Sequence, residues 1–451
     1  MAATISEILA KFKTNVADAL SSEVIGKVCQ CLGHVWRERV FDPVTTVHVF
    51  LLQILHGNVA CAALPHLAGL AFTATAYCQA RKRLPLTVFA VLLQRVCDAL
   101  LPVCDTTGLW HGHRTWTLDG SSFSMSDTPE LQNHFGQPSG QAKGCGFPTA
   151  HLLALFHAGT GLLLNVLASP WRTHDMKHAA SMSTQMRAGD ILVGDRGLCS
   201  FAHLALLFLQ EMHGVFRCHQ KQIVDFHVGR KHNKQRRGKR SATAMPSSRY
   251  LRRLGHWDHL VEYVKPQCQP KWMDEETWAS LPETLTVREL RYVTPQRGYR
   301  TRVITLVTTL IDANAYPAAD LADLYLSRWQ IEVNMRHLKT TMGMDVLHAK
   351  TLAGVTKELC MYAIAYNLVR LAMIDAARRQ NVAPERISFV DALRWLRNTP
   401  AGELLTRLVI NPLRPGRIEP RVRKRRPKEY DLMNKPRHKL RKELARKKVA
   451  A

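Results

Sequence analysis

Two acidic residues stand where carboxylates could share a metal ion. Asp119 closes a β-like run and is followed by Gly120, and Asp195 closes an apolar strand at a turn flanked by glycines. Carboxylates at the ends of neighbouring strands suit a hard divalent cation, because Mg²⁺ prefers oxygen ligands and keeps waters that substrate phosphates can replace. Each aspartate alone is also typical of a turn or a helix cap. The pattern therefore indicates a magnesium site, with an ordinary structural role as the alternative.

A predicted helix from about Ala318 to Met342 carries a third acid among polar neighbours. At 100° per residue, four of its side chains share a sector about 60° wide: Tyr325, Arg328, Glu332 and Lys339. An apolar stripe lies beside that sector, which predicts Glu332 at the rim of a core. A salt-bridged surface face, with Arg328 and Glu332 as an i, i+4 pair, has the same pattern. A tyrosine and two cations around one acid also describe a site for a phosphate backbone.

The elements that must position these residues fall into five segments. We expect them at 1–105, helical; 106–219, strands and then alternating helices and strands; 220–300, an insertion of short β-like pieces; 301–380, a strand and two helices; and 381–451, a helical segment and a basic tail. Strands followed by alternating helices and strands predict a mixed α/β fold. Three tryptophans of the insertion are typical of a small core: Trp257, Trp272 and Trp278.

The N-terminal segment has helical apolar periodicity at 44–55 and 86–101. A polar and basic interruption, Tyr77 to Arg83, separates the two stretches. An ordinary helical bundle with a basic loop explains this pattern as well as DNA recognition does. Arg81 and Arg83 are our candidate DNA contacts within it.

The charge of the chain favours a polyanionic partner. Its 451 residues include 62 Lys and Arg against 36 Asp and Glu, a formal net charge of +26. Two runs, at 230–253 and 414–451, supply 22 of these charges, which leaves the rest of the chain close to neutral. Nucleic acid is the first candidate and an anionic membrane surface the second, while solvated runs without a partner are the plain alternative. Binding through such runs should depend on salt and only weakly on base sequence.

The cysteines and the N-terminus predict a cytoplasmic protein. Eleven cysteines are scattered along the chain, and an odd, dispersed set is unlike the disulfide framework of a small secreted domain. No apolar segment of signal-peptide or membrane-spanning type stands out. We therefore expect reduced thiols and no membrane association.

The acidic and basic positions together resemble a known family. Tyr325-x2-Arg328-x3-Glu332-x6-Lys339 resembles the Tyr-Arg-Glu-Lys signature of bacterial insertion-sequence transposases of family four, a group of DDE cut-and-paste enzymes. That family's two aspartate motifs are similar, in the same order, to TLDGSSFSM around Asp119 and DILVGDRGLCS around Asp195.

The resemblance extends over nearly the whole chain. It includes RVFDPVT and YCQARKRLP near the N-terminus and PRVRKRRPKEYDLMNKPR in the tail. One departure is Asn334-Met335, where an aromatic residue is common in the family; neither position is a proposed ligand. The resemblance implies an RNase H-like mixed-sheet core interrupted by a β-rich insertion, with an N-terminal helical domain and a basic C-terminal tail.

The resemblance also implies a mechanism. Asp119, Asp195 and Glu332 would hold two Mg²⁺ ions about 3.5 to 4 Å apart, with Mn²⁺ as an expected substitute. One ion would activate water or a 3′-hydroxyl, and the other would stabilise the leaving oxygen. Water would first cut a transposon end, and the freed 3′-hydroxyl would then attack target DNA.

The remaining signature residues would handle the DNA. Arg328 and Lys339 would neutralise and position the phosphate, and Tyr325 would contact a neighbouring phosphate or sugar. An aromatic residue of the insertion would stabilise a flipped base, for which the three tryptophans are unranked candidates. The expected partners are double-stranded DNA, at terminal inverted repeats and at the target, and a second copy of the chain, as a homodimer on DNA. The expected location is the bacterial cytoplasm, at the nucleoid.

Two other functions remain open on the sequence. One is a non-catalytic DNA-binding protein derived from a transposase, in which the basic runs act and the acids do not. The other is a nuclease of the same fold that cuts DNA without joining it. The intact Asp, Asp, Glu set favours the transposase.

Overall fold

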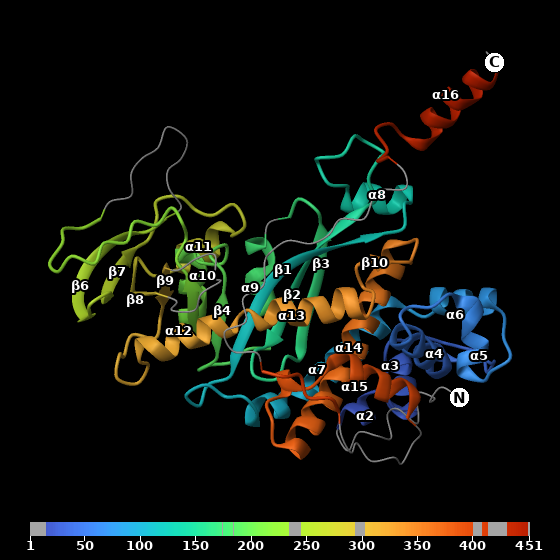
Figure 1. The fold of residues 1–451 in the computed structure, drawn as a ribbon, viewed down its shortest axis with the longest axis horizontal. Coiled ribbons are helices and arrows are strands. Elements are labelled where there is room, and N and C mark those ends of the chain that lie inside the picture. Colours follow the sequence, from blue (N-terminus) through green and yellow to red (C-terminus); the bar gives the residue numbers. More distant parts are fainter. Residues whose placement is uncertain are drawn as a thin grey trace.

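The computed structural model describes residues 15–173, 175–183, 185–233, 245–293, 303–399, 408–413 and 431–449. The basic stretches 234–244 and 414–430 therefore lie outside the described residues. A ten-stranded sheet with helices on its faces forms the centre of the described chain (Figure 1). The predicted mixed α/β class is confirmed.

The sheet has the strand order β3-β2-β1-β4-β5-β9-β8-β7-β6, and β10 pairs separately with β1. Its strands are β1 (Thr115–Met125), β2 (Thr149–His157), β3 (Leu163–Pro170), β4 (Ile191–Gly194), β5 (His213–Arg217), β6 (Ser247–Gly255), β7 (Asp258–Val264), β8 (Thr284–Val293), β9 (Val303–Thr308) and β10 (Val346–Leu347). The pairs β1–β4, β4–β5 and β1–β10 are parallel, and the other pairs are antiparallel. The strands of the predicted insertion, β6 to β8, continue the sheet beyond β9.

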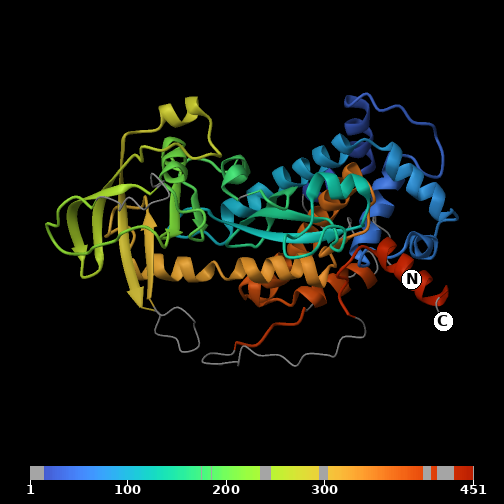
Figure 2. The same ribbon diagram turned by 90° about the horizontal axis from the view of Figure 1, so that it is seen from above.

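Helices cover both faces of the central strands. Every residue of β4 is buried, as expected for an apolar parallel strand covered on two sides. On one face, α12 (Ala318–Ser327) and α13 (Gln330–Arg336) run end to end across the sheet, while α10 (Phe201–Leu209) and α11 (Glu275–Ser280) lie on the opposite side (Figure 2). A compact apolar cluster, which includes Val193, Val215 and Leu324, fills the space under α12.

The N-terminal helices pack beside the β2–β3 end of the sheet (Figure 1). They are α2 (Asn15–Ala19), α3 (Ser22–Cys31), α4 (Pro43–Leu55), α5 (Leu64–Ala68), α6 (Ala74–Arg83) and α7 (Leu86–Thr106). The shorter helices elsewhere are α8 (Pro129–Phe135), α9 (Met176–Met182), α15 (Phe389–Asn398) and α16 (Arg437–Val449). One apolar core joins the N-terminal helices to α14 (Leu352–Gln380) and to strands β1 to β3.

Local caps set the starts of several helices. Asp42 accepts a hydrogen bond from Thr45 N at 2.7 Å, and Pro43 occupies the first turn of α4. Thr73 caps α6 in the same way through Ala76 N. Residues 77–83 are therefore part of a helix, because the Thr73 cap starts α6 before the polar run. Of the two alternatives for this run, a basic loop is excluded.

Two helices of the described chain, α7 and α14, are long and apolar enough to cross a membrane by length and composition. The most apolar window of α14 is 94% buried inside the protein, and that of α7 is 33% buried. A buried core helix has the same composition as a membrane span, so burial in the core accounts for α14.

The predicted helix from Ala318 to Met342 is broken into three pieces. Hydrogen bonds between residues three apart tighten the chain after α12, as in Ile331 N to Arg328 O at 2.9 Å. Ser327 Oγ also donates to Leu324 O at 2.7 Å, a side-chain bond that bends helices. After α13, residues His337–Thr341 form a π-helical turn. The uniform spacing of 100° per residue is therefore wrong for this segment, although its polar groups still reach one site.

Candidate active site

The site lies where one edge of β1 has no strand partner. That edge pairs with β4 at Thr115 to Thr117 and with β10 at Ser124 and Met125. Between them, residues 118–123 lack a strand partner on that edge within the described chain. We call this stretch the β1 gap. It opens beside the carboxyl end of β4.

Asp119 and Asp195 meet at the β1 gap. Thr117 is paired with Val193, so Asp119 and Asp195, each two residues further on, lie at the same level and on the same face. Asp195 Oδ1 accepts a hydrogen bond from Gly197 N at 2.8 Å, which fixes its turn. The structure thus brings the two predicted aspartates together.

The carboxyl group of Asp119 is held in an environment that disfavours its charge. Burial raises the pKa of Asp119 to about 6, against the opposing effects of Arg328 and of the Gly120 N–H. The negative charges of Asp195 and Asp175 add to the rise. A bound cation would relieve this cost by stabilising both aspartates in their ionised form.

Arg328 links the first aspartate to the glutamate. Its Nη1 lies 3.7 Å from Asp119 Oδ2, and its Nη2 lies 3.9 Å from Glu332 Oε1. The Arg328 side chain is only 13% exposed, whereas those of Asp119 and Glu332 are 27% and 49% exposed. The i, i+4 pair of Arg328 and Glu332 is present, but its 3.9 Å separation is longer than a hydrogen bond. Glu332 lies at the rim of the site.

Tyr325 and Lys339 complete the set from either end of the broken helix. Tyr325 is buried, and the guanidinium of Arg328 lies 5.8 Å from the centre of its ring. Lys339 Nζ donates to Ser121 Oγ at 2.9 Å, and Ser121 shares a face of β1 with Asp119. The structure therefore gathers all four signature residues around the two aspartates.

Arg217 is a residue of the site that the sequence reasoning missed. It ends β5, the strand parallel to β4, and its charge acts on Tyr325: burial raises the pKa of Tyr325, while Arg328 and Arg217 lower it. Alternation along β5 places Arg217 on the α12 face, next to Asp195, the residue that directly follows β4. The sequence signal for it was a basic residue directly after the apolar pair Val215-Phe216.

Asp175 directly precedes α9, where an aspartate side chain ordinarily caps the helix. It makes no side-chain capping bond to α9; its carboxylate pairs with His151 Nε2 on β2. This pair packs behind β1, against Gly120, where a Cβ atom would lie only 2.8 Å from Asp175 Oδ1. The sequence carried no signal for a contact between residues so far apart.

The candidate DNA contacts Arg81 and Arg83 lie away from the β1 gap, among the N-terminal helices. The guanidinium of Arg81 covers the ring of Phe50 at 3.6 Å and donates to Gln53 Oε1 at 3.1 Å. Its contacts are therefore those of a packing residue. Arg83 is exposed and lines a pocket with the loop before α4.

The three tryptophans of the predicted insertion differ in exposure. Trp272 and Trp278 pack against the main core. Trp257 is 40% exposed in the turn between β6 and β7. The next residue, Asp258, belongs to a row of strand partners that runs through Leu290 and Leu306 to Arg217. Of the three tryptophans, Trp257 is therefore the exposed one, and it lies at the same end of the strands as Asp195.

The carboxylates of the site match a divalent cation in donor type. Within the described chain, no group of three or more His, Cys, Asp or Glu side chains is arranged to hold a metal ion. The guanidinium of Arg328 stands between Asp119 and Glu332, where it provides positive charge. Asp119 and Asp195 lie near enough for the charge of one to act on the other, so their oxygens could share a cation, and Glu332 would join them by turning its exposed side chain.

Comparison with known proteins gives consistent relatives. Residues 110–368 match the family model described as Transposase DDE domain. The chain is 26% identical over 354 residues to "Transposase InsG for insertion sequence element IS4" of Escherichia coli K12, covering 72% of this chain and 73% of that protein. It is 35% identical over 89 residues to "Probable transposase for insertion sequence element IS5377" of Geobacillus stearothermophilus, covering 20% and 23%.

Among solved structures, the piggyBac transposase in a synaptic complex with hairpin DNA aligns with a TM-score of 0.44 and 9% sequence identity. The alignment covers 88% of this chain and 79% of that one.

Proposed function

The chain belongs to the transposase DDE domain family, whose model matches more than half of it, and we propose that the β1 gap is where this DNA transposase cuts and joins DNA. The family expected from the signature residues is thereby confirmed, as is an enzyme that acts on DNA. The observation that carries the site assignment is the meeting of Asp119 and Asp195 at the gap, with Arg328 between Asp119 and Glu332.

In this proposal, Asp119, Asp195 and Glu332 hold divalent ions. Mg²⁺ is the first choice because the ligands are all carboxylate oxygens, and Mn²⁺ would substitute. When bound, these ions lower the pKa of water and stabilise the leaving oxygen of the phosphodiester. The burial of Asp119 supports this role, since a site that disfavours a bare carboxylate favours one paired with a cation.

The other side chains position the DNA strand. The Arg328 guanidinium can donate two parallel hydrogen bonds to a phosphate once a metal neutralises the carboxylates. Lys339 reaches the floor of the gap through Ser121 and would exchange that hydroxyl for a phosphate oxygen. Tyr325 and Arg217 would bind the adjacent phosphate from the α12 side.

The wider architecture is also part of the proposal. An antiparallel β1–β2–β3 ladder joined to parallel β4 and β5, with the glutamate on a later helix, supports an RNase H-like core. We assign end recognition to 1–105, the insertion to 220–300, and backbone contacts to the basic runs. Two transposon ends must be brought together, which supports a homodimer on DNA. A bacterial enzyme of this kind acts in the cytoplasm, at the nucleoid.

An end-cleavage and strand-transfer assay tests the function. Purified protein is incubated with labelled duplexes that carry the terminal repeats of its insertion sequence, a target plasmid, and either Mg²⁺ or EDTA. We expect Mg²⁺-dependent cleavage at the repeat boundary and joining of the labelled end to the plasmid. Cleavage without joining would indicate the nuclease, and binding without either reaction would indicate the non-catalytic protein.

A further inference from the structure

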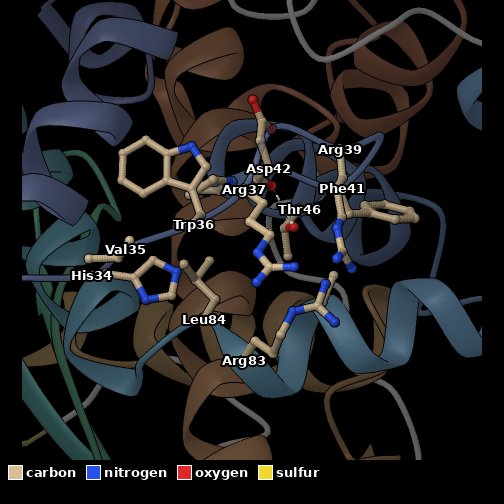
Figure 3. Close-up of a pocket in the computed structure, with 12 residues that line it drawn as sticks. His34, Val35, Trp36, Arg37, Arg39, Phe41, Asp42, Thr46, Arg83 and Leu84 are labelled. Atoms are coloured by element: carbon tan, nitrogen blue, oxygen red, sulfur yellow. Dashed lines mark hydrogen bonds between the residues drawn. The ribbon is translucent and has the colours of Figure 1, made fainter.

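A second basic site lies in the N-terminal region, away from the β1 gap. The loop between α3 and α4 and the end of α6 enclose a pocket of about 310 Å³ (Figure 3). Its walls carry Arg37 and Arg39 from the loop, Arg83 from α6, and the rings of His34 and Trp36. This volume is at the lower end of small-ligand pockets.

The pocket concentrates positive charge without a partner for it. Figure 3 shows the guanidinium groups of Arg37, Arg39 and Arg83 turned toward the same space. Within the described chain, none of the three forms an ion pair with a carboxylate. Asp42, the one acid of the wall, uses its Oδ1 to cap α4. Three cations held close together repel one another, so the site favours an anion that can contact several guanidiniums.

Packing, rather than ion pairing, holds the loop in this shape. The buried ring of Phe41 meets Phe72 edge-on, with centroids 4.7 Å apart, and contacts Tyr77 of α6 at 5.6 Å. The rings of His34 and Trp36 are nearly parallel, 6.1 Å apart with an angle of 19°. The arginines therefore project from a preformed surface and remain available for a ligand.

We propose that this pocket binds one nucleotide of the transposon-end DNA, with its phosphate on the three arginines and its sugar or base against Trp36. Guanidiniums match phosphate oxygens in geometry, and an indole face stacks on sugars and bases without regard to sequence. The inference rests on the proposed function of the chain as a DNA transposase. It adds an anchoring site that is separate from the catalytic carboxylates.

Binding by the full-length chain in EDTA tests this proposal independently of cleavage. The probe is a fluorescent duplex carrying the terminal repeat, titrated at several salt concentrations. We expect the variant with Arg37→Ala, Arg39→Ala and Arg83→Ala combined to bind about tenfold more weakly. The slope of log K against log salt concentration should also become less negative by about 0.9 for each phosphate contact removed. Arg394→Ala, which removes an exposed charge on α15, outside 1–105 and outside both basic runs, is the control and should bind like the parent.

Trp36 separates stacking from charge. Trp36→Ala should weaken binding while leaving the salt slope unchanged, and Trp36→Phe should restore most of the affinity because a ring is retained. An unchanged affinity and slope in a folded triple-arginine variant would overturn the proposal. The measurement needs no catalysis, so its failure leaves the proposed active site intact, and loss of the proposed active site leaves this result standing.

Discussion

At the scale of the residue, Asp119 links stability to function. Burial raises its pKa from an ordinary value near 3.8 to about 6. Its proton is thus held more tightly in the folded chain than in the unfolded chain. Without metal, stability therefore falls as the pH rises through this range, and the full cost is present above pH 6. Active sites commonly keep such a charge at the expense of stability.

Replacing this carboxyl group should stabilise the metal-free protein. A shift of about two pKa units corresponds to roughly 3 kcal/mol, so we expect Asp119→Asn to raise the melting temperature in EDTA at pH 7.5. The gain should shrink at pH 5, where the native aspartate is largely protonated. Mg²⁺ should raise the melting temperature of the parent but not of the variant. A variant that is equally stabilised at both pH values, or destabilised at pH 7.5, would contradict the assignment of the charge cost to Asp119.

At the scale of the element, the β1 gap explains why the acidic and basic side chains of the site come together where they do. One edge of β1 pairs with β4 at its start and with β10 at its end. The stretch between these pairings is left open to side chains and to substrate. The broken helix α12–α13 crosses the face of the sheet there, and Arg328 lies in the break, 3.7 Å from Asp119 Oδ2.

The sequence predicted the parts of this arrangement that local patterns control. Asp195 was expected at a strand end and follows β4 directly, and the apolar stripe predicted Glu332 at a rim. Asp119 was expected to close its strand, and that expectation is wrong, because β1 continues to Met125 along its partner β2. The break after Ser327 depends on hydrogen bonds between residues three apart in the sequence, and the spacing of apolar residues does not predict these. The partnership of Asp175 with His151 depends on the packing of α9 behind β1, which the residues around Asp175 do not reveal.

The close contact behind β1 gives a test at this scale. Gly120→Ala places a methyl group against the Asp175 carboxylate, and overpacking of this kind typically costs about 1 to 3 kcal/mol. We expect a lower melting temperature and slower cleavage, because β1 must shift next to Asp119. Adding Asp175→Ala should recover part of the stability, so the two changes should be non-additive. Strictly additive effects would show that the two groups do not meet.

At the scale of the whole molecule, charge and chemistry are separated. Most of the net charge of +26 belongs to two basic runs, parts of which lie outside the described residues. Helix α16 belongs to the second run, and Figure 1 shows it projecting from the body of the protein. It carries seven Lys or Arg residues and one acid, and a helix that is basic on all sides suits a phosphate backbone rather than a hydrophobic partner. The three carboxylates belong instead to the sheet-based part of the chain, around the β1 gap.

This separation means that cutting and holding DNA can be tested apart. The most direct test measures Mg²⁺-dependent cleavage of a terminal-repeat duplex by Asp119→Asn, Asp195→Asn and Glu332→Gln, alongside the affinity of each variant for the same duplex. Asp323→Asn, an exposed acid on α12, is the matched control. We predict that the three site variants bind DNA but do not cleave it, and that the control does both. Full cleavage by any one of the three site variants would contradict the placement of the active site at the β1 gap.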